Sequence, residues 1–232
     1  MTKVINVLDH GLVRLVDSMG SDLSIARSAR VSYDAAWRAG ENEKSDTKLI
    51  NYLWRNGHTT PFENVTFTFE IKAPLFVLAQ WQRHRTWSYN QISARYCELP
   101  EVFYVPEPND IGVQSKSNKQ MRVHEDKASA NNVLAAILMR EANAGAFRTY
   151  RFLLEKGVPR ELARSVLPTA TYSHMFATVN LLNLLKFLSL RTHEHAQKEI
   201  QVYAHAMLEL IKPIVPVAVA AWETEKEAVK SK

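Results

Sequence analysis

Residues 65–85 read VTFTFEIKAPLFVLAQWQRHR, and this stretch decides the fold. Every second residue from Val65 to Ile71 is apolar and the residues between them are polar, which is the alternation of a strand with one buried face. Pro74 then begins an apolar run, and proline is tolerated in the first turn of a helix. The stretch therefore predicts a half-buried strand followed at once by a helix, with the basic residues RHR where that helix ends.

The sequence on either side predicts an α+β fold that is rich in helix. Helical and strand patterns do not alternate regularly, which argues against a chain of βαβ units. The helix over 120–156 is expected to break near Gly145, and residues 213–232 are expected to form a tail of uncertain order. We further predict a β-hairpin over 3–17 with its turn at Gly11, a strand over 170–179, and helices over 22–30, 46–56 (Ser45 as N-cap, Gly57 as C-cap), 159–167 and 180–205, the last as one helix or a pair.

The composition is that of an ordinary soluble globular protein. The chain has 232 residues, of which 46% are hydrophobic and 23% charged, so one domain over 1–232 is expected. The net charge of +5 is a mild excess that favours anionic ligands such as nucleotides. Cys97 is the single cysteine, which excludes a disulfide within the chain and fits a reducing, cytoplasmic compartment. We expect no signal peptide and no membrane span, because no apolar run is long and uninterrupted.

The segment over 82–96, QRHRTWSYNQISARY, crowds four cationic or titratable side chains among hydroxyl and aromatic residues. Crowded like charges repel one another, and guanidinium groups match phosphate and carboxylate geometry, so the segment predicts an anion-binding site. The small residues at Ser93-Ala94-Arg95 would let backbone amides approach a phosphate. Two alternatives stay open: a solvated basic turn, and a surface that binds single-stranded RNA.

The leucine-rich helix over 180–205 carries the second candidate. Asn180 and Arg191 are eleven residues apart, close to three turns, so they share one face. An arginine beside an apolar surface is costly unless it is paired, which indicates a functional role. The alternative is a surface ion pair between Arg191 and Glu194.

Three weaker signals have ordinary structural explanations. Arg160 and Arg164 in PRELARSVLP face one side, as in any amphipathic helix, and the turn NGHTTPFEN over 56–64 suits capping. The pair His193 and His195 allows a metal hydrolase as an alternative, but no metal-ligand spacing surrounds it, so we predict no metal. A lone thiol such as Cys97 is usually inert.

Several segments in a fixed order resemble the flavin-dependent thymidylate synthases. RHRTWSYNQIS over 83–93 matches their R-H-R-x7-S motif, and QISARY continues the match. The similarity covers nearly the whole chain to about residue 213. It is also carried by RSARVSYD (27–34), GHTTPFEN (57–64), FEIKAPLFVLAQWQRHR (69–85), GVPRELARSVLP (157–168) and LRTHEHAQKEIQ (190–201).

The resemblance implies an enzyme that makes dTMP from dUMP. Methylenetetrahydrofolate would give the carbon, and FAD would carry hydride from NADPH. The implied fold is a mixed, largely antiparallel sheet flanked by long helices. The implied assembly is a homotetramer with its sites at subunit interfaces, whose partners are these small molecules and neither nucleic acid nor membrane.

The resemblance also implies the site residues. Arg191 would be the catalytic residue, polarising the N3–C4 amide of uracil without a cysteine nucleophile. His58 would lie near the folate or nicotinamide entry, and Glu63 would support these contacts. The dUMP ligands would be Gln80, Arg83, Gln91, Ser93, Ala94, Arg95, Arg164 and Arg191; the FAD ligands would be Ser32, Thr60, Arg83, His84, Arg85, Gln91, Asn180, Lys186 and His195.

Three positions depart from the family pattern. Gln91 stands where glutamate is frequent, so a negatively charged ligand is lost there. Leu182 replaces an arginine that often touches the flavin, and Lys186 replaces asparagine or histidine. The last two departures bear on the adenosine side of FAD binding rather than on the reaction.

Overall fold

A five-stranded sheet in the order β1-β2-β3-β7-β4 forms the frame of the protein. The computed structural model describes residues 3–123 and 127–230. Every pairing within this sheet is antiparallel, so the α+β class and the largely antiparallel sheet are confirmed. The strands are β1 (Val4–Val7), β2 (Gly11–Met19), β3 (Thr66–Pro74), β7 (Tyr172–Asn180) and β4 (Ser88–Gln91).

The alternating stretch over 65–71 lies at the centre of this sheet. Val65, Phe67, Phe69 and Ile71 are all fully buried, which confirms the alternating pattern of β3. Pro74 is both the last residue of β3 and the N-cap of α3 (Leu75–Trp81), so the strand passes directly into the predicted helix. The basic segment follows α3 and leads into β4.

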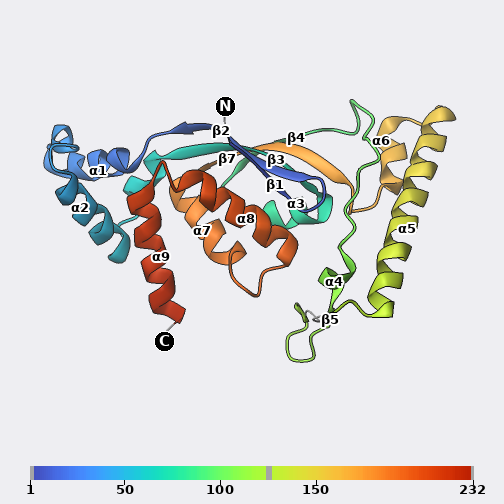
Figure 1. Ribbon diagram of the computed structural model, residues 1–232. Helices are drawn as coiled ribbons and strands as arrows, with labels where there is room; N and C mark the ends of the chain where they lie inside the picture. The colour runs from blue at the N-terminus through green and yellow to red at the C-terminus, as the bar shows by residue number, and fades with distance from the viewer. Residues whose placement is uncertain (1–2, 124–126, 231–232) are drawn as a thin grey trace.

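Three C-terminal helices cover one face of the sheet (Figure 1). The pattern over 180–205 is a helix pair, and a third helix follows it. Leucines of the first, aromatic and aliphatic residues of the other two, and the buried face of the sheet form one continuous core. These helices are α7 (Leu181–Arg191), α8 (Lys198–Ile211) and α9 (Pro216–Lys230).

The remaining helices lie at the two ends of the sheet. Helices α1 and α2 lie together beside α9 at one end, while the long helix α5 stands at the other end beside α6 (Figure 1). A small separate core of Phe147, Tyr150 and Ala163 joins α5 to α6. The elements are α1 (Asp22–Arg30), η1 (Val31–Tyr33), η2 (Ala36–Arg38), α2 (Glu43–Arg55), η3 (Thr60–Asn64), α4 (Pro108–Ile111), β5 (Val113–Gln114), β6 (Arg122–Val123), α5 (Ala130–Glu155), α6 (Arg160–Ala163) and η4 (Arg164–Val166).

The prediction for residues 213–232 is wrong, because an ordered helix follows the two prolines. Pro216 begins α9 instead of ending the fold, as a first-turn proline can. The carboxylate of Asp22 accepts hydrogen bonds from the backbone N–H groups of Val217 (2.8 Å) and Ala218 (3.0 Å) and so caps the new helix. Burial raises the pKa of this carboxyl group. Residues 231–232 lie outside the described part of the chain.

Two helix boundaries also differ from the prediction. Helix α2 begins three residues earlier than expected, because the side chain of Asn42, and not of Ser45, accepts the capping hydrogen bond (3.0 Å). Helix α5 begins at Ala130 and runs unbroken through Gly145, because one glycine costs only about 1 kcal/mol in a helix and Phe147 and Tyr150 anchor the turns that follow. Gly57, just past the end of α2, has a φ of +70°, a conformation that glycine adopts without strain.

No helix in the described ranges is both long and apolar enough to cross a membrane.

Candidate active site

Arg191, the last residue of α7, lies against the end of α3. Its Nε donates a hydrogen bond to Nε2 of His84 (3.1 Å), and its Nη2 donates to the backbone oxygen of Gln80 (3.3 Å). The alternative pairing with Glu194 is therefore not observed. Three predicted ligands, Gln80, His84 and Arg191, therefore meet in space, although more than a hundred residues separate Arg191 from the other two in the sequence.

His84 holds Arg191 by accepting rather than donating. Burial, and next the positive charge of Arg191, lower the pKa of the imidazole to about 4, so the ring is neutral near pH 7. Because Nε2 accepts the hydrogen bond from Arg191, the ring proton belongs on Nδ1. Burial also lowers the pKa of Arg191, which remains charged.

Aromatic side chains pack on one side of His84 and Arg191. The ring of Phe187 packs edge-on against His84 at 4.9 Å and is stacked on Trp81 at the same centroid distance. Trp87 packs against both Trp81 and Phe187. The guanidinium of Arg191 therefore lies above an apolar surface, where a charge acts more strongly than in water.

A cavity of about 500 Å³ opens beside Arg191 and is lined by the last residues of α7 and by residues that link α7 to α8. The rings of His193 and His195 both face this cavity and lie 4.7 Å apart. Nδ1 of His193 accepts the backbone N–H of His195 at 3.1 Å. Within residues 3–123 and 127–230 no group of three potential metal ligands surrounds them.

A second group of predicted residues lies beyond the other end of β4. Arg95 forms an exposed ion pair with Glu161 (3.3 Å), and Nε of Arg164 donates to the backbone oxygen of Glu161 (3.3 Å). Ser93 begins the tight turn, its hydroxyl accepting from the N–H of Arg95 at 3.3 Å, and Ala94 is buried beside it. The structure thus brings Ser93, Arg95 and Arg164 together, as expected for one anion site.

These two groups do not meet within one chain. His84 precedes β4 and Ser93 follows it, and the four residues of β4 alone span roughly 13 Å. Helix α6, which carries Glu161, lies beside α5, away from α7 (Figure 1). Gln91 lies between the groups, its amide donating to the hydroxyl of Ser173 at 2.7 Å.

The predicted flavin residues are spread along the surface. Ser32 in η1, Thr60 in η3 and the neighbouring His58 are exposed near one end of the sheet. Asn180 caps α7 by accepting the N–H of Asn183 at 2.9 Å. Arg83, Arg85, Lys186 and His195 are exposed, whereas Leu182 is buried in the core.

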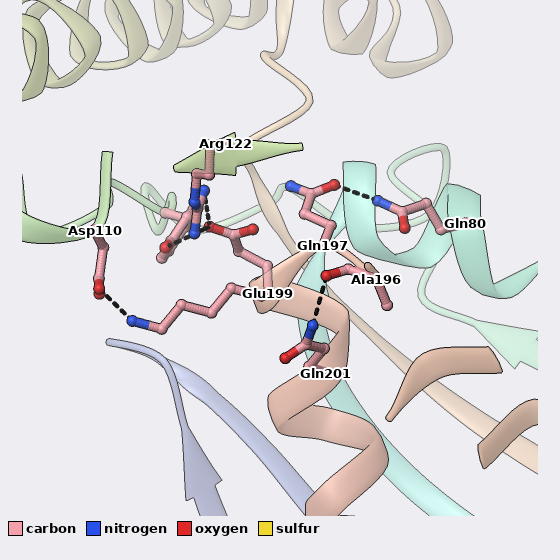
Figure 2. A network of polar contacts seen from close by, with 9 residues as sticks. Gln80, Asp110, Arg122, Ala196, Gln197, Glu199 and Gln201 are labelled. Atoms are coloured by element: carbon pink, nitrogen blue, oxygen red, sulfur yellow. Dashed lines mark hydrogen bonds and ion pairs between the residues drawn. The ribbon is translucent and has the colours of Figure 1, made fainter. Parts of the chain in front are cut away.

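Sequence reasoning missed a polar cluster at the start of α8. Oε1 of the buried Glu199 accepts from both terminal nitrogens of Arg122 (2.9 and 3.0 Å) and from the hydroxyl of Tyr104 (3.1 Å) (Figure 2). Close by, the amide of Gln80 donates to that of Gln197 at 2.5 Å. The sequence carries one sign of this cluster: Glu199 lies four residues before Tyr203 and so falls on the apolar stripe of α8, where a glutamate needs a polar partner.

The comparisons with known proteins agree with this fold. Residues 14–217 match the sequence model of the family described as "Thymidylate synthase complementing protein". Flavin-dependent thymidylate synthases of Treponema denticola and Thermus thermophilus are 45% and 48% identical to the chain; they cover 98% and 94% of it, and the matches span 84% and 78% of those proteins. A solved structure, a UMP/dUMP methylase PolB from Streptomyces cacaoi bound with 5-Br dUMP, aligns with a TM-score of 0.85 at 37% identity, over 95% of this chain and 97% of that one.

The fold and the matched segments define a methyltransferase enzyme. The chain belongs to the family of flavin-dependent thymidylate synthases.

Proposed function

We propose that this protein converts dUMP to dTMP with methylenetetrahydrofolate as carbon donor, NADPH as reductant and Arg191 as the residue that activates the uracil ring. The observation that carries the proposal is Arg191 itself. Its guanidinium is held by a neutral His84 and a backbone carbonyl at the edge of a cavity of about 500 Å³. Neither partner neutralises its charge, so the charge is available to a ligand.

The chemistry follows from that free charge. Methylation at C5 requires electron density at C5 of uracil, and polarising the N3–C4 amide supplies it. A guanidinium aimed at this edge stabilises the developing anion, more strongly because the aromatic side chains exclude water from one side. A covalent route through Cys97 has no support, because its thiol donates a hydrogen bond to the backbone oxygen of Ser93 (3.6 Å) and no described residue forms an ion pair with it.

We assign the phosphate of dUMP to the turn beyond β4. Ser93 and Arg95 would bind it with backbone and side-chain donors, and Arg164 would add a second guanidinium. The exposed ion pair between Arg95 and Glu161 is weak, so a phosphate can displace it. Gln80, Arg83, Gln91 and Ala94 would complete the contacts with the nucleotide.

The residues on the surface fit FAD. Arg83 and Arg85 are exposed and have no ion pair or side-chain hydrogen bond with any described residue, so both cations are free for a pyrophosphate. When bound, the flavin supplies hydride taken from NADPH. Lys186 is exposed where it can bind a phosphate or the adenosine, and the buried Leu182 takes no part. The other contacts would come from Ser32, Thr60, His84, Gln91, Asn180 and His195, with His58 near the entry.

We propose that the site is completed by a second copy of the chain, in a homotetramer. The residues assigned to the phosphate (Ser93, Arg95 and Arg164) and Arg191 lie at opposite ends of β4. They are too far apart to hold one small nucleotide within a single chain. Helix α5 also exposes an apolar stripe that its own chain leaves uncovered, and a patch of this kind marks an interface. The stripe consists of Val133, Leu134, Ile137 and Leu138, each 44–55% exposed.

Mixing two inactive variants tests the shared site. Arg191→Ala and Arg164→Ala would each be inactive alone. If the site is built from two copies, unfolding and refolding them together regenerates some intact sites, and dTMP formation returns in part. No recovery from the mixture, under conditions that restore the wild type, would contradict the shared site.

A flavin spectrum tests the proposed enzyme most simply. The purified protein should show flavin absorbance near stoichiometry and should bleach with NADPH. A colourless protein that cannot be reconstituted with FAD would contradict the proposal. The function implies one catalytic domain over the chain and a cytoplasmic location, in keeping with the single cysteine.

A further inference from the structure

The loop between α7 and α8, residues 192–197, separates two cavities. The cavity of about 500 Å³ beside Arg191 lies on one side of it, and a second cavity of about 540 Å³ lies on the other, toward Arg122. His195 and Ala196 line both cavities. A loop with open space on two sides has few packing contacts to hold its shape, so its path depends on hydrogen bonds.

One side chain makes three of these hydrogen bonds. The NH₂ group of Gln201, on the first turn of α8, donates to the backbone oxygens of Ala196 (2.6 Å), His193 (2.9 Å) and Glu194 (3.3 Å). Figure 2 shows the amide of Gln201 directed at the oxygen of Ala196. Within the described ranges the oxygens of Glu194 and Ala196 accept from no backbone N–H, so Gln201 takes the place of backbone pairing in this loop.

Gln201 itself lies on a firmly held helix. Its neighbours Ile200 and Tyr203 are fully buried in the core. The hydroxyl of Tyr203 also donates to the backbone oxygen of Lys72 in β3 at 2.8 Å. The start of α8 is therefore fixed relative to the sheet, and the three hydrogen bonds from Gln201 fix the loop relative to both.

His195 depends on the loop for its position. Its side chain is 58% exposed, and its backbone N–H donates to Nδ1 of His193 within the same loop. We propose that Gln201 is a positioning residue for flavin binding, which holds the loop so that the ring of His195 faces FAD. The inference deepens the proposed function and rests on it, because His195 is one of the residues proposed to bind FAD. Arg191 has partners of its own outside the loop, so its part in the reaction does not depend on Gln201.

The test is the dissociation constant of FAD, measured from flavin fluorescence as the holoprotein is diluted. Gln201→Met nearly keeps the length of the side chain and suits a helix, but it has no N–H donor and adds no charge. Gln201→Leu makes the same removal with a smaller side chain and replaces the methionine variant if that variant does not fold. The matched control is Gln114→Met, because Gln114 lines the same 540 Å³ cavity and also donates to two loop oxygens, at 2.9 and 3.1 Å, in a loop that carries no proposed flavin contact.

We expect Gln201→Met to weaken FAD binding by about tenfold, the scale of one or two lost hydrogen bonds, with Gln114→Met unchanged. A folded Gln201→Met protein that binds FAD as tightly as the wild type would overturn the inference. An equal loss in Gln114→Met would overturn it as well, because the effect would then belong to the cavity and not to the loop.

A double-mutant cycle separates positioning from general stabilisation. If Gln201 acts through His195, Gln201→Met causes no further loss of FAD affinity in a protein that already carries His195→Ala. Losses that add in the double variant would show that Gln201 does not act through His195. Failure of the proposed function would instead appear as a wild-type protein that lacks flavin and cannot be reconstituted with FAD.

Discussion

The contact between His84 and Arg191 makes a specific prediction about pH. Protonating His84 would remove the acceptor of the hydrogen bond and place a second positive charge 3.1 Å from Nε of Arg191. The pKa of the imidazole is lowered from 6.5 to about 4, first by burial and then by Arg191. The folded protein therefore resists a protonation that the unfolded chain accepts.

The sign and size of the effect follow from proton linkage. Between pH 6.5 and 4 the unfolded state binds more protons at this residue, so stability is full above pH 6.5 and is lost as the pH falls toward 4. The difference of 6.5 − 4 = 2.5 pKa units corresponds to about 3 kcal/mol at most. His84 is only half-buried, so solvent screening reduces the expected contribution to about 1–2 kcal/mol.

The measurement is NMR of protein carrying ¹³C-labelled histidine rings, with His84→Asn to assign the resonance. We expect the His84 signal to titrate near pH 4, and urea unfolding to show that the variant loses less stability than wild type between pH 7.5 and 5. Activity should fall over the same low-pH range. A His84 signal that titrates near 6.5, with equal pH dependence in both proteins, would show that His84 is not held neutral against Arg191.

Three further predictions concern the frame and the thiol. Gly11→Ala would place a Cβ 2.2 Å from the hydroxyl of the buried Tyr203, so urea unfolding should show a loss of about 1–3 kcal/mol; an unchanged midpoint would contradict this packing. Asp22→Ala removes the cap of α9, and thermal melts should report a loss of about 0.5–2 kcal/mol, with Asp17→Ala on an exposed strand end as the neutral control. Cys97→Ala should retain most of the dTMP-forming activity; an inactive but folded variant would revive covalent catalysis.

Local patterns in the sequence predicted the central part of the fold well. Strict alternation over Val65–Ile71 identified β3 because a two-residue period is unambiguous there. The helix pair after Asn180 and the strand before it were also confirmed. The periodicity and the end residues of these elements are typical of strands and helices, so they could be recognised without knowing any distant contact.

The C-terminal helix could not be predicted in this way. Two prolines and a charged end read as a tail, and the residue that caps α9 is Asp22, almost two hundred positions earlier. Gly145 failed as a helix breaker for a similar reason, since its cost of roughly 1 kcal/mol is small beside the packing of a long helix.

In the candidate site, too, local features could be predicted from the sequence and contacts between distant residues could not. The cationic segment and Arg191 stood out by composition and spacing, but the contact between His84 and Arg191 joins residues 107 positions apart and required the structure. Glu199 was not among the candidate residues predicted from the sequence. Its burial against Arg122 depends on a segment with no regular pattern, which sequence periodicity cannot place.

The most direct test of the central claim is single-turnover conversion of dUMP to dTMP by Arg191→Ala, with flavin content measured on the same sample. We expect the variant to retain FAD and to lose about 10²–10³-fold in rate, the cost typical of removing one donor that stabilises a developing anion. The exposed Arg148→Ala on α5 serves as the control and should turn over normally. Wild-type turnover in a flavin-loaded Arg191→Ala protein would show that Arg191 does not activate the uracil ring.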